Sequence, residues 1–261
     1  PKGLHLANLI RQSGGKAILV LDGLEALQRP GVNTSEWLLT AGGVRELIVE
    51  LAVGVSFDGL CILTSRTPIA ELQPFLGTVA REFPVHGLGK QAGKELLHEC
   101  GVHRGSDAEL SKAVEETDGN PFVLSLLGKY LEQTQQGDIT RRNQINLAFD
   151  GHARGIIRTY EEWLQDKPAG DILRLLGFFL GPASVSAIKE ICKQRIPHLT
   201  DQIDPDGVAA LVGRSIGSLN TMGLLHPQPN STDLIICHPL ISSYFRESVR
   251  RERPAAWKEA N

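Results

Sequence analysis

Two acidic side chains follow the first apolar run of the chain. Asp22 comes directly after residues 17–21, and Glu25 stands three residues further on. Mg²⁺ prefers hard oxygen ligands, often reached through water, and a water that attacks a phosphate needs a carboxylate nearby. The pair is therefore a candidate for magnesium-dependent phosphate chemistry. A plain turn or a helix cap would use the same residue types.

A third chemically distinctive side chain, Arg66, follows shortly after the second apolar run. Residues 59–63 are followed by Thr64, Ser65 and Arg66. The guanidinium group is permanently charged, and its donors form a fork that matches phosphate oxygens. Arg66 is thus a candidate for binding a terminal phosphate. An ordinary surface arginine after a strand is the alternative.

Two further candidates stand where helices are expected to begin. Pro121 follows Gly119 and Asn120, and His238 precedes Pro239. The exposed N–H groups and the dipole at a helix start favour an anion, so His238 is placed to touch an anionic ligand. Proline is also common at the first position of helices that bind nothing, and His238 can be an ordinary helix-start histidine.

The first part of the chain has the pattern of an α/β layer that would position Asp22, Glu25 and Arg66. Short unbroken apolar runs alternate with apolar residues at helical spacing, which predicts strands buried on both faces of a parallel sheet and helices between them. The expected helices cover 6–10 and 44–51, and the expected strands cover 17–21, 59–63 and 83–86. We assign residues 1–87 to this domain.

The rest of the chain is mostly helical in pattern. Residues 88–150 are expected to form a small helical domain, with helices over 90–100, 107–117 and 121–134. Residues 151–253 have a winged-helix layout, in which helices are followed by two short strands and a closing helix. Its helices are expected over 153–165, 171–180, 185–193, 208–220 and 239–250, and its strands over 223–226 and 233–237. Residues 254–261 look like the start of a following helical region.

In order, these segments resemble the STAND class of P-loop ATPases, which includes the NB-ARC switches of plant immune receptors. Residues 18–25 look like the Walker B element, 61–66 like the sensor strand, 119–121 like the GxP motif and 236–240 like the winged-helix histidine motif. Pro239 stands where plant receptors have an aspartate after the histidine. The nearest likeness is to bacterial members whose switch precedes helical repeats.

The resemblance implies a role for each candidate. Asp22 would hold Mg²⁺ through water, Glu25 or a neighbour would orient the attacking water, and Arg66 would contact the terminal phosphate. Pro121 would pack on adenine, and His238 would touch the diphosphate and hold the closed state. The implied ligands are ATP, ADP and Mg²⁺. The implied partners are an upstream phosphate-loop segment with an effector domain, a downstream helical-repeat sensor, and other copies of the ATPase module.

The phosphate loop of such proteins, G-x-x-x-x-G-K-[ST], does not occur in this sequence. Residues 89–95 come nearest, but they have one residue too few between the glycines, carry Glu95 where a hydroxyl is needed, and lie in an expected helix. Gly14, Gly15 and Lys16 precede a strand and open no helix. We therefore expect the chain to begin after the phosphate loop of a longer protein.

Composition argues against several other classes of protein. The formal net charge is −3, and Arg214 is the only lysine or arginine between residues 204 and 233, whereas phosphate contacts of a DNA-binding wing and helix need several. No apolar stretch reaches the length of a membrane span, and the N-terminus lacks a secretory pattern. The four cysteines are widely spaced, which favours a reducing cytoplasm. Cys100 and His103 lack a second ligand pair for zinc.

Three hypotheses follow from the sequence. The first is a regulatory ATPase that holds ADP in its off state and ATP with Mg²⁺ in its on state. The second is a scaffold of the same fold that has lost turnover. The third, which the charge pattern disfavours, is a winged-helix DNA-binding regulator. A Walker A lysine in upstream sequence would favour the first over the second.

Overall fold

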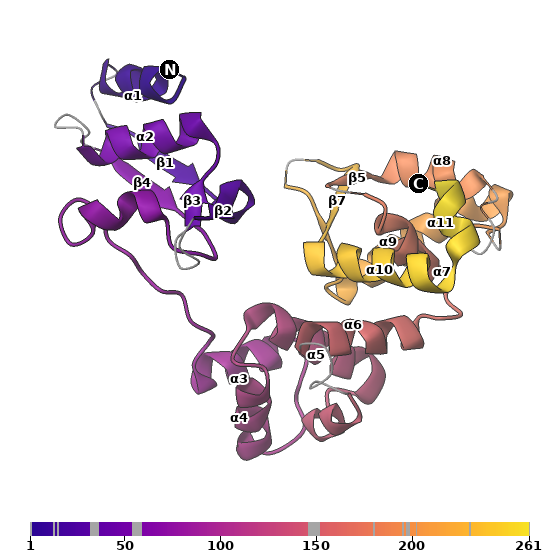
Figure 1. The fold of residues 1–261 in the computed structure, drawn as a ribbon. Coiled ribbons are helices and arrows are strands. Elements are labelled where there is room, and N and C mark those ends of the chain that lie inside the picture. Colours follow the sequence, from indigo (N-terminus) through magenta and orange to yellow (C-terminus); the bar gives the residue numbers. More distant parts are fainter. Residues whose placement is uncertain are drawn as a thin grey trace. The chain divides into compact units, whose positions relative to one another are not determined.

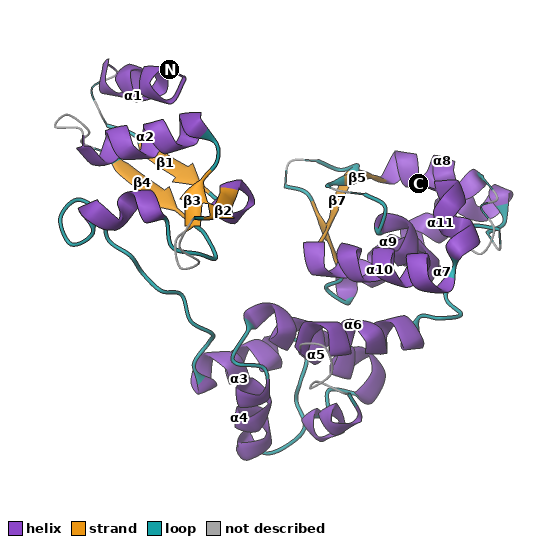
Figure 2. Cartoon of the chain, in the orientation of Figure 1, coloured by secondary structure: helices purple, strands orange, loops and turns teal. Residues whose placement is uncertain are grey.

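The computed structural model describes residues 2–12, 14, 16–31, 37–53, 59–145, 152–179, 181–194, 196, 199–201, 203–229 and 231–260. The chain divides into two compact units, Pro1–Val85 and His86–Asn261, and each is described by itself. Figure 1 follows the chain through both units, and Figure 2 separates helices from strands.

The first unit is built on a parallel pair of strands, as the sequence predicts. Strands β1 (Ile18–Leu21) and β4 (Leu60–Leu63) pair in the register Ile18↔Leu60 to Leu21↔Leu63. The two predicted helices are also present, as α1 (Lys2–Gln12) and α2 (Gly42–Val53). Apolar residues at helical spacing in α2 bury Leu47, Ile48 and Leu51.

Only one face of this pair is covered. Leu19 and Cys61 pack against Ala7, Leu47 and Leu51 of the two helices, which lie on the same side of the strands (Figure 2). The alternating residues point the other way and are between 43% and 75% exposed; they are Ile18, Val20, Leu60 and Ile62. The expectation that both faces are buried is therefore wrong for this chain, because its described helices supply only one covering layer.

The segment between β1 and β4 contains more structure than the predicted loop. After the 3₁₀ turn η1 (Leu24–Leu27), β2 (Gln28–Pro30) pairs antiparallel with β3 (Trp37–Leu39). Residues 32–36 between them lie outside the described residues. Beyond β4 comes the 3₁₀ segment η2 (Ala70–Phe75).

The predicted third strand over 83–86 is wrong. These residues form no strand, and both Phe83 and Val85 are exposed. Pro84 has no N–H group to donate to a ladder, and no described strand lies beside the segment. The run therefore connects the two compact units without joining a sheet.

The second unit opens with the expected helices. They are α3 (Lys90–Glu99), α4 (Asp107–Glu116), α5 (Pro121–Gln135) and α6 (His152–Trp163), with the 3₁₀ segment η3 (Ile139–Gln144) before α6. Side chains fix where two of them start. Ser106 and Glu109 form a capping box on α4, and Asn120 accepts hydrogen bonds from two amides of α5.

The second half of this unit alternates helices with short strands. Its helices are α7 (Pro168–Leu176), α8 (Val185–Lys193), α9 (Val208–Thr221), α10 (Pro239–Glu252) and α11 (Pro254–Ala260), with a 3₁₀ turn η4 (Pro205–Gly207) before α9. Strands β5 (Ala183–Ser184), β6 (Leu225–Pro227) and β7 (Leu234–Cys237) form an antiparallel sheet in the order β5-β7-β6. The sequence predicts all of these helices and two of the strands, but not β5.

One hydrophobic core runs through both halves of the second unit. It includes Leu97, Leu124, Ile157, Leu173 and Phe245, all with no exposed surface. The sequence places a domain boundary at residue 150, and this shared core joins the segments on either side of it.

Two further features concern the environment of the chain. Within the described ranges, no helix combines the length and apolar character needed to cross a bilayer. All four cysteines are free thiols, and burial raises the pKa of Cys192 and of Cys237 to about 11.

Candidate functional site

The carboxyl ends of β1 and β4 lie side by side because the strands are parallel and end in register at Leu21 and Leu63. Asp22 and Thr64 are the next residues of the two strands. In open parallel sheets this edge is where ligands bind. The fold thus brings the first two predicted motifs together.

Thr64 joins these two strand ends through its hydroxyl group. Its Oγ1 donates to Oδ1 of Asp22 at 2.5 Å and accepts from the amide of Gly23 at 2.9 Å. The backbone of Thr64 adds bonds to Leu21 and Leu24, each of 3.0 Å. One oxygen of Asp22 is therefore fixed, while its Oδ2 accepts no hydrogen bond from any described residue.

Glu25 and Arg66 lie at the same edge and form an ion pair. Arg66 Nε is 3.2 Å from Glu25 Oε1, and the two side chains are 76% and 34% exposed. Both groups are accessible to solvent, so a phosphate that offers two or three oxygens can replace the glutamate as partner of the guanidinium. Three of the predicted site residues, Asp22, Glu25 and Arg66, are thus neighbours.

The chemistry of this edge fits a magnesium–phosphate ligand. Asp22 is exposed and offers a carboxylate oxygen, Thr64 offers a hydroxyl, and Arg66 offers the cation. A single carboxylate that acts partly through water is a usual protein contribution to a Mg²⁺ site beside phosphates. Among described residues, no three His, Cys, Asp or Glu side chains converge as a fuller metal cage.

The other two predicted residues belong to the second unit. Pro121 is the first residue of α5, and His238 caps α10 by accepting the Leu240 amide on Nδ1 at 3.2 Å. The ring of Phe122 stacks on His238 with centroids 3.8 Å apart and planes 19° from parallel. The starts of α5 and α10 therefore meet, which places Pro121 and His238 near one another.

Sequence reasoning missed two residues of this arrangement. Phe122 follows the predicted Pro121 directly. Its place in the arrangement is shown only by its stacking on His238, which lies far along the chain. Gln28, six residues after Asp22, is only 8% exposed and bonds to the loop that carries Arg66. A polar residue at the start of a strand carries no local sign of such a role.

The rejected phosphate-loop look-alike lies in a helix, as expected. Residues 90–95 are in α3, where Lys90 pairs with Glu115 at 2.5 Å and Lys94 with Asp107 at 2.6 Å. The hydrogen bond to Glu115 raises the pKa of Lys90. Both ammonium groups thus form ion pairs with neighbouring helical residues of the second unit.

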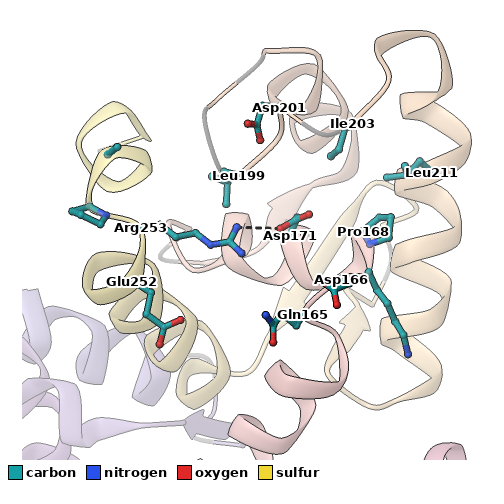
Figure 3. A pocket seen from close by; sticks show the side chains of 13 residues that line it. Gln165, Asp166, Pro168, Asp171, Leu199, Asp201, Ile203, Leu211, Glu252 and Arg253 are labelled. Atoms are coloured by element: carbon teal, nitrogen blue, oxygen red, sulfur yellow. Dashed lines mark hydrogen bonds and ion pairs between the residues drawn. The ribbon is translucent and has the colours of Figure 1, made fainter.

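The second unit also contains a cavity of about 790 Å³ at the start of α7 and the junction of α10 with α11 (Figure 3). Asp171 stands in its wall and pairs with Arg174 at 2.9 Å and with Arg253 at 3.4 Å. Burial raises the pKa of Asp171, and the two arginines oppose that shift. The cavity is lined by none of the residues that the sequence singles out.

Comparisons with known proteins assign no family to the chain. No protein-family model matches it, and no curated protein sequence matches it. Among solved structures, it is similar to the Walker-type ATPase PABY2304 of Pyrococcus abyssi, with 21% identity and a TM-score of 0.38. That match covers 93% of this chain and 67% of the other. A likeness of this size fixes neither the family nor the activity.

Proposed function

We propose that the chain is the central module of a nucleotide-dependent signalling switch of the STAND or NB-ARC kind. In the off state it would hold ADP, and in the on state ATP with Mg²⁺, to control oligomerisation or release of an effector. The observation that carries this proposal is the meeting of Asp22, Thr64, Glu25 and Arg66 at the carboxyl edge of β1 and β4.

Each residue of this edge has a role in the proposal. Asp22 would hold Mg²⁺ through water with the oxygen that Thr64 leaves unused. Arg66 would exchange Glu25 for the terminal phosphate. The Glu25 carboxylate would then be available to orient the attacking water. A switch needs different affinities for ATP and ADP more than it needs rapid turnover.

Pro121 and His238 supply the remaining contacts in this proposal. Pro121 would pack on adenine, and His238 would touch the diphosphate from the start of α10, where backbone N–H groups favour an anion. We interpret the segment from α7 through α10, with its three-stranded sheet, as a winged-helix domain. The stack of Phe122 on His238 supports this role, because it holds the imidazole at the start of α5.

The exposed apolar face of β1 and β4 supports the proposal that another polypeptide packs against this sheet. Parallel strands are normally covered on both faces, and these carry no charged residue. In the switch proposal, an upstream phosphate-loop segment completes this sheet. Self-association through the ATPase module and a downstream helical-repeat sensor complete the proposed set of partners.

The same exposed face favours the second candidate, a scaffold that binds proteins without turning over nucleotide. The two candidates differ in whether the edge of the sheet binds ATP. The DNA-binding alternative is weaker, because Arg214 is the only cationic residue between 204 and 233.

Calorimetry with ATP and ADP in the presence of Mg²⁺ tests the switch. We expect tight binding by a form extended upstream, with Asp22→Ala impairing Mg·ATP and His238→Ala selectively weakening ADP. Exposed residues of the same types serve as matched controls, Asp166→Ala and His103→Ala, which should bind as the unmodified protein does. If the extended protein binds neither nucleotide, the switch proposal fails and the scaffold candidate replaces it.

A further inference from the structure

Gln28 is a buried polar residue just behind the edge of the sheet. It is the first residue of β2, and only 8% of its surface is exposed. A buried amide has to satisfy both its carbonyl oxygen and its NH₂ group, because an unmade hydrogen bond in the interior is costly. The hydrogen-bond partners of the Gln28 side chain therefore indicate its structural role.

All three of these partners lie in the loop that carries Arg66. Oε1 accepts from Ser65 Oγ at 2.5 Å and from Thr67 Oγ1 at 2.8 Å, and Nε2 donates to the carbonyl of Pro68 at 3.0 Å. The Thr67 amide also donates to Ser65 Oγ at 3.2 Å. One side chain thus holds the residues on both sides of Arg66.

Glutamine suits this position for a chemical reason. Its carbonyl oxygen has two lone pairs for the two hydroxyl groups, and its amide supplies the donor for the Pro68 carbonyl. Glutamate would accept both hydroxyls but could not donate to Pro68 when ionised. Methionine would fill nearly the same volume and make none of these bonds.

We infer that Gln28 is a positioning residue for Arg66. By fixing the loop from Ser65 to Pro68, it holds the guanidinium at the edge where Asp22 and Thr64 lie. The expected effect of Gln28 on phosphate binding by Arg66 rests on the proposed function. The loop restraint itself can be measured without nucleotide.

The first test is limited trypsin digestion of the full chain, with cleavage after each basic residue followed by mass spectrometry. Arg66 is exposed, so its bond to Thr67 reports how often the loop opens. We expect Gln28→Met to raise cleavage after Arg66 about tenfold, with cleavage after Arg45 and Arg81 unchanged. Gln73→Met, an exposed glutamine of the same unit, is the matched control. Cleavage at the unmodified rate, or an equal rise at all three sites, overturns the inference.

The second test is a double-mutant cycle in the nucleotide-binding form of the protein. We expect Gln28→Met to weaken Mg·ATP about tenfold relative to ADP, since it displaces a charged contact. Gln28→Glu should recover part of the loss, because it keeps the two hydroxyl bonds. In an Arg66→Ala background, Gln28→Met should have no further effect.

The two tests separate failure of the inference from failure of the function. Additive losses in the cycle mean that Gln28 does not act through Arg66, which overturns the inference. Absence of nucleotide binding by the unmodified protein overturns the proposed function, and with it the phosphate contact, while the trypsin result still decides whether Gln28 restrains the loop.

Discussion

At the scale of single residues, the candidate site is held by exposed contacts that can be exchanged. The Glu25–Arg66 pair is open to solvent on both sides, and such pairs add about 0–1 kcal/mol to stability. Its partners can separate at little cost to the fold. That property suits the proposed role of Arg66, in which its guanidinium group exchanges a carboxylate for a phosphate.

The first prediction concerns this pair. We expect Glu25→Gln to change the free energy of unfolding by less than about 1 kcal/mol, because solvent screens the exposed charges. Urea unfolding followed by circular dichroism measures the change. Glu162→Gln, which removes the 63% exposed partner of Arg158 at 3.1 Å, is the control. A loss of several kcal/mol for Glu25→Gln alone would show that the pair is structural.

The second prediction concerns Asp233, which ties the start of β7 to the start of α8. Its oxygens accept from Ser184 Oγ at 2.5 Å and from the Oγ and amide of Ser186 at 2.8 and 3.1 Å. These hydrogen bonds favour the carboxylate and lower its pKa in the folded protein. The stabilisation is thus fully present above the unfolded pKa of about 3.9 and is lost as the pH falls through the folded value.

Melting temperatures of Asp233→Asn at several pH values test this linkage. We expect the variant to melt below the unmodified protein at pH 7, and the difference to shrink as the pH falls below about 4. Asp166→Asn, an exposed carboxylate with no hydrogen bond to described residues, should show no such convergence. If the difference in melting temperature stayed constant across the pH range, ionisation of Asp233 would not contribute to the pH dependence of stability.

At the scale of elements, β1 shows how two neighbouring apolar residues can have different roles. Leu19 packs against the helices, whereas Val20 points away and is 57% exposed. Hydrophobic stabilisation follows the area removed from water, so the two side chains should contribute unequally. The exposed one is instead available to another polypeptide.

The third prediction compares these two positions. We expect Leu19→Ala to lower the free energy of unfolding by about 2 kcal/mol, and the nearly isosteric Val20→Thr to change it by less than about 0.5 kcal/mol. Denaturant unfolding measures both. Val20→Thr should also reduce the fluorescence of an apolar dye bound to the folded protein, and Leu19→Ala should not. Equal destabilisation by the two changes would mean that both faces are covered.

At the scale of the whole molecule, the fully buried hydroxyl of Tyr160 bonds to both halves of the second unit. Tyr160 Oη lies 3.2 Å from the carbonyl oxygen of Leu126 and 3.3 Å from that of Met222. Burial raises its pKa well above the usual value, so it remains a donor. Together with the shared core, this contact should make the two halves unfold cooperatively.

The fourth prediction follows from that link. We expect Tyr160→Phe to lower the stability of the unit by about 1 kcal/mol, the net worth of a buried hydrogen bond. Hydrogen exchange should show equal loss of protection in α5 and α9. Tyr130→Phe is the control, because its ring neighbours that of Tyr160 and its hydroxyl makes no such bridge between described residues. Loss of protection in only one helix would contradict a single cooperative unit.

Much of the fold could be predicted from the sequence because it depends on residues close together in the chain. The repeat of apolar residues predicted α3, α4, α5 and α8 to within one residue at either end, and caps such as Ser106 and Asn120 explain their starts. The polar residues after two apolar runs indicated that Asp22 and Arg66 follow strands. Parallel pairing then brings those strand ends to one edge.

Contacts between residues far apart in the chain were decided only by the tertiary structure. They include the pairing of β5 with β7, the stack of Phe122 on His238, and the bonds from Gln28 to the Arg66 loop. The sequence alone also could not show that Val20 and Ile62 are exposed. The spacing of residues determines which way a side chain points from its own helix or strand, whereas burial and partners depend on which distant segments fold against it.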